Sequence, residues 1–287
     1  MLLTKLNAFL RMIRPTNCLM IGFAVIIGEF IAIGRLPQAR EAILGSLSAA
    51  LLMAGTMAIN DYYDLEIDRI NRPDRPLPSG AITPHQAISV GLGSSAVGLA
   101  VAALLNIGSL AIAAFALSLT VYYNTRGKKS GLYGNVLVSI CIALPFIFGG
   151  VAVQRVTLVL LFFSVMSFTA NLGREVTKGI MDVEGDRLRM IRTVALVRGS
   201  KEASRLAAAL YLMAVGLSVA PPVLQMVNMS YLPIVLVSDA GFVSSSVSLL
   251  RQHDKENAGR IKNRVMIWMF IGLLAFITGS VNMQAVA

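Results

Sequence analysis

Two stretches of the 287-residue chain concentrate its acidic side chains. Nine of the 15 Asp and Glu residues lie in residues 60–80, NDYYDLEIDRINRPDRPLPSG, and in residues 174–192, REVTKGIMDVEGDRLRMIR. Carboxylate oxygens are hard ligands that suit Mg²⁺, and Mg²⁺ keeps several coordination positions for water and phosphate. Both stretches also carry Lys and Arg. The combination predicts a site for magnesium and a polyanion.

The spacing of the aspartates fits a helix in both stretches. At about 100° per residue, a helix through the first stretch places Asp61, Asp64 and Asp68 on one face. In the second stretch Asp182 and Asp186 are four residues apart and share a face. A single charged stretch is usually only a solvated loop, but two such sets in helical register favour a site. We expect the two sets to end two helices and to face each other across a cavity.

The rest of the chain is apolar enough to lie in a membrane. Hydrophobic residues make up 56% of it, charged residues 14%, and the mean hydropathy is +0.71. These values exclude a disordered chain and most soluble proteins, in which about a quarter of the residues are charged. A membrane-spanning helix needs about 20 mostly apolar residues. Nine segments approximately qualify: 17–33, 42–60, 85–105, 107–123, 134–153, 156–173, 203–220, 231–250 and 264–282.

The net charge of +10 reports orientation in the membrane. When a basic residue at the end of a span is counted with the adjoining segment, the odd-numbered extramembrane segments carry 22 of the 25 Lys and Arg. Basic residues concentrate on the cytoplasmic side of membrane proteins. We therefore expect a multi-pass protein of the cell membrane, with its N-terminus and both acidic stretches in the cytoplasm.

The basic residues do not indicate nucleic acid as a partner, because they flank apolar segments and are not interleaved with aromatic side chains. No polar linker divides the chain. We therefore expect a single domain over residues 1–287, all-α, with nine transmembrane helices around a central cavity and no obligate protein partner.

A polyanion site at a membrane surface suits a diphosphate with a lipid tail. Neutralising the diphosphate makes it a better leaving group, so an allylic C–O bond can ionise and a nucleophile can capture the cation. The basic side chains near the two stretches are candidates for holding the phosphates: Arg72, Arg75, Lys128, Lys129, Arg174 and Lys178.

Taken together, these motifs resemble the UbiA superfamily of intramembrane prenyltransferases over nearly the full chain. The matching features are R-P-T-N at residues 14–17, N-D-x-x-D-x-x-x-D at residues 60–68, R-P-L-P-S-G at residues 75–80, Lys128 with Gly134 and Asn135, and N-L-G-R-E-x-x-K-x-x-x-D-x-x-G-D, whose last residue is Asp186. The resemblance implies a cavity open to cytoplasm and lipid, two Asp-rich Mg²⁺ sites and a prenyl diphosphate donor.

The resemblance also implies roles for individual residues. The metal ligands would be Asp61, Asp64, Asp68, Asp182 and Asp186, of which all but Asp61 are also expected to be catalytic. The resemblance gives Asn60, Lys128, Arg174 and Lys178 as substrate contacts, and Asn17 of the R-P-T-N match with the nearby Arg72 and Arg75 complete the expected set. The adjacent Lys129 could take the place of Lys128.

Within the superfamily, the R-P-x-N-C start and the pairing of R-P-L-P-S-G with D-V-E-G-D most resemble the archaeal synthases of digeranylgeranylglyceryl phosphate. This implies transfer of a geranylgeranyl group from its diphosphate to the free hydroxyl of geranylgeranylglyceryl phosphate, forming the second ether bond of archaeal lipids. The alternative is an aromatic acceptor of the 4-hydroxybenzoate type in quinone biosynthesis. An acceptor with its own phosphate calls for extra cations, and Arg14, Arg187 and Arg189 are candidates, although membrane topology accounts for them equally well.

Two carboxyl groups lie inside predicted spans. Glu29 and Asp239 could serve a function or could be structural, since ionisable residues in a membrane are often functional. They raise the alternative of a transporter, but transport sites usually lie near the midplane. The acidic clusters sit on one side only, which argues against transport.

Overall fold

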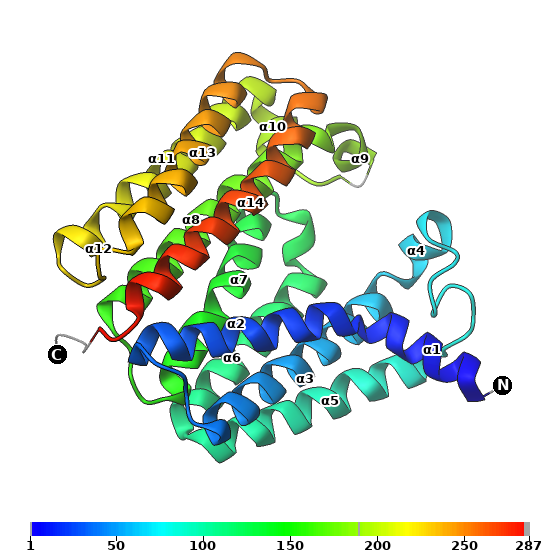
Figure 1. Ribbon diagram of the computed structural model, residues 1–287. Helices are drawn as coiled ribbons and strands as arrows, with labels where there is room; N and C mark the ends of the chain where they lie inside the picture. The colour runs from blue at the N-terminus through cyan, green and yellow to red at the C-terminus, as the bar shows by residue number, and fades with distance from the viewer. Residues whose placement is uncertain (1, 189, 284–287) are drawn as a thin grey trace.

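The computed structural model describes residues 2–188 and 190–283, and in these ranges it contains helices and no strand (Figure 1). In chain order the elements are α1 (Leu2–Ile13), α2 (Pro15–Ile33), α3 (Ala39–Tyr63), α4 (Leu65–Asn71), α5 (Pro84–Leu105), α6 (Ile107–Thr125), the 3₁₀ helix η1 (Gly127–Lys129), α7 (Leu132–Ala152), α8 (Leu158–Met181), α9 (Val183–Leu188), α10 (Val194–Arg198), α11 (Ser200–Ser218), α12 (Ala220–Val223), α13 (Tyr231–Arg251) and α14 (Lys255–Ser280).

Nine helical segments of this described part are long and apolar enough to cross a membrane, as predicted. They are α2, α3, α5, α6, α7, α8, α11 together with α12, α13 and α14. Sixteen of the eighteen ends agree with the predicted spans to within three residues. The exceptions are the end of α8, which lies eight residues beyond residue 173, and the start of α14, which lies nine residues before residue 264.

Both exceptions have the same cause: hydropathy marks where lipid ends, whereas a helix continues into water as long as its backbone stays bonded. The polar extension of α8 carries the motif REVTKGIM. The start of α14 is fixed by the side chain of Asp254, which accepts a hydrogen bond of 2.8 Å from the backbone N–H of Asn257. A cap of this kind satisfies a backbone donor that the first turn leaves free.

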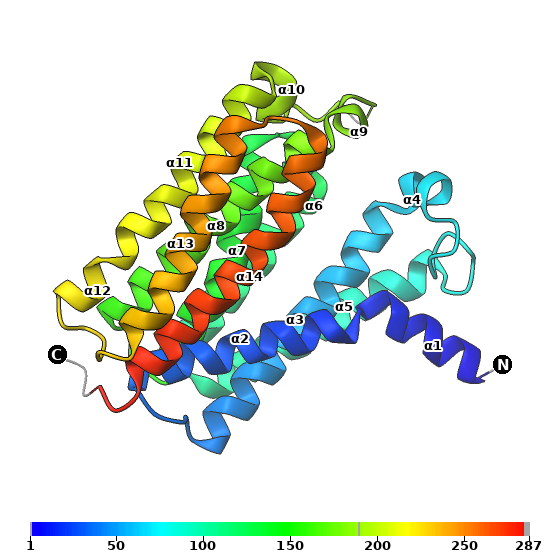
Figure 2. The ribbon, with the colours of Figure 1, turned by 45° about the horizontal axis from the view of Figure 1, so that its top comes forward.

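The long helices form two groups that meet along α7. In the first, α3 packs most extensively on α5, and α2 packs on both α3 and α7. In the second, α8 packs on α11 and α14, and α13 packs on α11 and α14, as Figure 2 shows. Helix α7 contacts α2, α6 and α8 and so joins the groups.

Small residues let the helices of the first group approach closely. A Cβ added at Gly28 of α2 would collide with the backbone of Phe146 in α7, and one added at Gly149 of α7 would collide with the backbone of Val25 in α2. Close backbone approach through small residues is a common way for helices to associate in lipid. The crossing of α2 and α7 therefore depends on glycine at these two positions.

The two short helices that lie inside the acidic stretches, α4 and α9, project from the same end of the molecule. Figures 1 and 2 both place α4 and α9 away from α12 and the C-terminus. The fold thus brings α4 and α9, more than 100 residues apart in sequence, to one end of the bundle.

Candidate active site

The two acidic stretches are called the first motif (residues 60–80) and the second motif (residues 174–192). In each motif a long helix is followed by a short one. Asp64 separates α3 from α4, and Asp182 separates α8 from α9. The backbone carbonyl of Asp64 accepts a hydrogen bond of 2.8 Å from the backbone N–H of Asp68, and that of Asp182 accepts one of 2.8 Å from the backbone N–H of Asp186. The helical turn therefore passes through both junctions, which confirms the predicted helical register.

The first motif is held by arginines. The Nη2 atom of Arg14 lies 2.6 Å from Oδ1 of Asp61, whose side chain is only 4% exposed. Arg75, from the loop after α4, forms a short ion pair with Asp68 and lies 3.8 Å from Asp61. Burying a carboxylate is costly unless a cation and hydrogen bonds accompany it. Arg14 and Arg75 supply both.

Lys128 completes the first motif from a different part of the chain. It lies on η1, between α6 and α7, and its Nζ atom lies 2.7 and 2.8 Å from the two carboxylate oxygens of Asp64. The same Nζ donates to Oδ1 of Asn60 at 2.6 Å, and Nδ2 of Asn60 donates to Asp64 at 3.2 Å. Lys129 is exposed and forms no ion pair in the described part of the chain. The structure thus brings Lys128 to the motif.

The second motif is arranged differently. Arg174 lies 3.2 Å from Glu175, and Lys178 lies 3.6 Å from the same carboxylate. Asp182 is half-buried and forms no ion pair with any residue in the described ranges, whereas Asp186 is buried. Arg174 and Lys178 therefore share Glu175, and neither of them pairs with Asp182.

The remaining predicted contacts lie at the edge of the site. Asn17 is exposed and its amide approaches Sδ of Met57 at 3.9 Å. Arg72 is exposed, without a side-chain hydrogen bond or ion pair to the described residues. Of the three extra cations considered above, Arg14 is occupied by Asp61, Arg187 is exposed on α9, and Arg189 lies outside the described residues.

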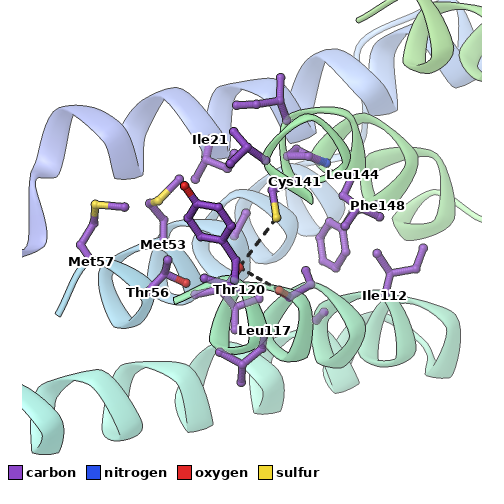
Figure 3. A pocket seen from close by; sticks show the side chains of 18 of the residues that line it. Ile21, Met53, Thr56, Met57, Ile112, Leu117, Thr120, Cys141, Leu144 and Phe148 are labelled. Atoms are coloured by element: carbon purple, nitrogen blue, oxygen red, sulfur yellow. Dashed lines mark hydrogen bonds between the residues drawn. The ribbon is translucent and has the colours of Figure 1, made fainter. Parts of the chain in front are cut away.

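An apolar cavity of about 250 Å³ leads away from the first motif. Its wall comes from α2, α3, α6 and α7, and Asn60, which also binds Lys128, lines it. Figure 3 shows Met57 at one end and Ile112 and Phe148 at the other. The lining positions on α3 run from residue 49 to residue 60, which at 1.5 Å per residue is a depth of about 16 Å. A long apolar chain could lie here with its polar end at Asn60.

The carboxylate oxygens of the two motifs are the donor atoms that would bind Mg²⁺. Among residues 2–188 and 190–283, no three His, Cys, Asp or Glu side chains are grouped as a ready-made metal site. Mg²⁺ is usually bound by one or two carboxylates together with substrate phosphates, so a complete protein cage is not required. Asp64 and Asp182, both half-buried, offer carboxylate oxygens of the right chemistry. The residues present therefore fit the ion.

Two further side chains of the site, Glu175 and Asn171, were not among the predicted site residues. Glu175 binds both Arg174 and Lys178, and Asn171 donates a buried hydrogen bond of 3.1 Å to Ser139 of α7. Both lie inside the N-L-G-R-E motif, so the motif itself was the signal. The partners of Glu175 lie on its own helix and that of Asn171 lies on α7, and the motif alone does not show either pairing.

The two carboxyl groups inside the spans differ. Glu29 is fully buried on α2, and neither of its oxygens has a hydrogen-bond partner among the described residues. Asp239 on α13 accepts a hydrogen bond of 2.7 Å from Ser218. Neither lies in an acidic motif.

Comparisons with known proteins agree with this architecture. The model of the UbiA prenyltransferase family matches residues 21–278. The digeranylgeranylglyceryl phosphate synthase of Methanopyrus kandleri is 38% identical over 272 residues, covering 95% of this chain and 98% of that protein. A solved structure of digeranylgeranylglyceryl phosphate synthase is 31% identical, with a TM-score of 0.89 over 97% of this chain and 99% of that one.

A more distant structure shares the fold. A UbiA homologue from Archaeoglobus fulgidus, solved with DMAPP and Mg²⁺, is 20% identical, with a TM-score of 0.66 over 93% of this chain and 98% of its own. At this identity the likeness concerns the fold alone.

Proposed function

Because the chain belongs to the UbiA prenyltransferase family and is a multi-pass membrane protein, we propose that it transfers a geranylgeranyl group from geranylgeranyl diphosphate to the free hydroxyl of geranylgeranylglyceryl phosphate. The product would carry the second ether bond of archaeal membrane lipids. The names of relatives at 38% and 31% identity, matched over nearly their full lengths, support this choice of reaction.

The observation that carries the proposal is the junction at Asn60. This side chain lines the apolar cavity and binds Lys128, so a prenyl tail and its diphosphate find complementary surroundings on either side of one residue. The tail would lie between α2, α3, α6 and α7. The diphosphate would lie at the mouth, where Lys128 and Arg75 offer charge-assisted hydrogen bonds, with Lys178 contributing from α8.

Magnesium is the cofactor of this proposal. When bound, the ion would neutralise charge on the leaving diphosphate, and the metal ligands would be drawn from Asp61, Asp64, Asp68, Asp182 and Asp186. To bind the ion, Asp64 would have to release its contacts with Lys128, which donates to both of its carboxylate oxygens. Lys128 then remains beside the same position to contact phosphate.

The reaction balances without a further co-reactant. The allylic C–O bond of the donor breaks and its electron pair leaves with the diphosphate. The hydroxyl oxygen of the acceptor forms the new C–O bond with the allylic carbon, and its proton passes to a motif carboxylate. Asn60, Lys128 and Arg75 stabilise charge on the leaving group as it develops, which is where a site lowers the barrier most.

We place the active site on the cytoplasmic side of the cell membrane. Helices α4 and α9 project from one end of the bundle, and this end carries the segments with most of the Lys and Arg. Positive charge near span ends marks the cytoplasmic side. Labelling of a single cysteine placed at an exposed α4 position, in sealed vesicles of known orientation, tests this assignment.

An acceptor panel tests the reaction itself. Purified protein is given geranylgeranyl diphosphate and Mg²⁺ with either geranylgeranylglyceryl phosphate or 4-hydroxybenzoate, and products are separated by mass. We expect an ether product only with the glyceryl phosphate. Product only with the aromatic acceptor would replace the proposed reaction by an aromatic prenylation.

A further inference from the structure

Helices α8 and α14 pack against each other in a register that two contacts define. A Cβ at Gly259 would lie 3.6 Å from Sδ of Met181, and Nη2 of Arg174 lies 3.4 Å from Sδ of Met266. The helices are antiparallel, because α8 runs toward the acidic end and α14 starts there (Figure 1). Seven residues separate the contacts on each helix.

This register places a further cation beside the second motif. Stepping three residues from Gly259 along α14, and three from Met181 back along α8, brings Lys262 opposite Lys178. Residues three or seven apart share a helix side, so Lys262 lies on the side of α14 that carries both contacts. Its side chain is half-buried.

The cations gathered there exceed the carboxylates that neutralise them. Arg174 and Lys178 share one partner, Glu175. Lys262 forms no ion pair within the described ranges, not even with Asp182, which directly follows Met181. The Nε–H of Arg174 is buried and has no acceptor among the described residues. An unpaired buried donor costs free energy, so an anion with several acceptor oxygens would be favoured at this place.

A second apolar cavity begins one helical turn deeper. It has a volume of about 200 Å³ and is lined from α8 by residues as far as Ala170 and from α14 by residues from Met269 onward. Ala170 precedes Arg174 by four residues, and Met269 follows Met266 by three. The cavity therefore lies directly below the cationic cluster on the same two helices.

The wall of this second cavity offers little to a polar ligand. Of its three polar side chains, Ser238 donates to the carbonyl of Trp268 and Asp239 accepts from Ser218. Most of the remaining lining is aliphatic or aromatic. Ile142 of α7 lines both cavities, so the two lie on either side of one side chain.

We propose that Lys262, together with Arg174 and the cavity below them, is a second lipid site that takes a single-chain lipid phosphate monoester. The phosphate lies against Lys262 and Arg174, and the chain lies between α7, α8, α13 and α14. The inference deepens the proposed function and rests on it, because a reaction between two lipid substrates needs a second place for a tail. In that reaction the occupant is the acceptor, geranylgeranylglyceryl phosphate.

The test compares Lys262→Gln with Arg260→Gln in the purified full-length protein. Arg260 lies two residues away and is exposed, on the opposite side of the helix, and it serves as the matched control. We expect Lys262→Gln to raise the KM for geranylgeranylglyceryl phosphate about tenfold, the effect of losing one charge-assisted hydrogen bond. The KM for geranylgeranyl diphosphate should stay unchanged, and Arg260→Gln should change neither constant.

A phosphate-free acceptor makes the test specific. With geranylgeranylglycerol in place of the phosphate, Lys262→Gln and the unmodified protein should have the same KM. The proposal is overturned if the variant changes the KM for the donor, or weakens both acceptors equally, or has no effect.

A binding measurement separates this proposal from the proposed function. Geranylgeranylglyceryl phosphate with a photoreactive group at the end of its chain should label α14 between residues 269 and 276, and Lys262→Gln should reduce the labelling about tenfold at low probe concentration. Labelling confined to α3 and α6 would overturn the second site. If α14 is labelled but no glyceryl ether forms, the site stands and the proposed reaction is wrong.

Discussion

The first acidic motif comes with its own cations, whereas the second leaves an aspartate without one. Asp61, Asp64 and Asp68 are paired with basic side chains from three separate places in the chain. At α8, by contrast, Arg174 and Lys178 are drawn to Glu175 and Asp182 pairs with no described residue. The two motifs have similar sequences, but the aspartates of the first are paired with cations whereas Asp182 of the second is not paired with any described residue.

This difference indicates how each motif meets a ligand. In the first, tertiary packing has already neutralised the carboxylates, so a metal or phosphate must compete for side chains that are bound to one another. In the second, Asp182 can accept a cation without breaking an ion pair, so the motif is the more open of the two. The following predictions test this contrast.

The largest effect is expected from removing one aspartate of each motif. Asp64→Ala and Asp182→Ala should each lower turnover by about 10³-fold or more, because each removes a carboxylate from the Mg²⁺–diphosphate site. Both positions are half-buried at helix ends, so the variants should remain folded by circular dichroism. Product formation from both lipid substrates measures the loss.

Glu66→Gln is the matched control for these variants. Glu66 is exposed on α4 and pairs only with Arg69 in the described part of the chain, a type of surface pair worth less than about 1 kcal/mol. Its turnover should equal that of the unmodified protein. Undiminished turnover in either aspartate variant would contradict the two-motif site.

Chelation should separate activity from stability. EDTA should abolish turnover and added Mg²⁺ should restore it, because the leaving diphosphate needs the ion. The melting temperature should change by no more than about 2 °C, because Arg14, Arg75 and Lys128 already neutralise the first motif. Full activity in EDTA would exclude a magnesium-dependent reaction, and a large fall in melting temperature would show that the metal holds the first motif together.

A smaller effect is expected on stability from the cations themselves. Arg14→Ala leaves the carboxylate of Asp61 buried without its nearest partner, which should cost about 1–3 kcal/mol and lower the melting temperature. Arg174→Ala should cost less, because Glu175 keeps Lys178. Thermal unfolding in one detergent compares the two.

Adding Asp61→Asn to the Arg14→Ala variant should recover part of the loss, since it removes the unpaired charge. If Arg174→Ala is the more destabilising of the two single variants, the contrast between the motifs is wrong.

The span count and the helical register of the aspartates could be predicted because both depend on neighbouring residues. Twenty apolar residues cross a membrane wherever they occur, and a four-residue spacing places two aspartates on one side of a helix. The partners could not be predicted in this way. Arg14 and Asp61 are 47 positions apart and Lys128 and Asp64 are 64 apart, so the packing of α1, α3 and η1 decides which cation meets which carboxylate.

A central cavity was predicted, but the residues that line the two cavities could not be, for the same reason. Each is the space left by four or more helices, and the residues that line it have no common spacing. Lys262 illustrates the limit. In the sequence it is one basic residue among several near a span end, and only the contacts of α8 with α14 place it beside Lys178.

The position of Ile142 between the two cavities limits how the specificity of such a protein can change. Because Ile142 lines both cavities, a bulkier residue at this position would reduce the volume of both. A smaller residue would connect the two cavities. Selection for a longer chain in one substrate would therefore alter the fit of the other. The lengths of the two lipid chains would therefore tend to evolve together.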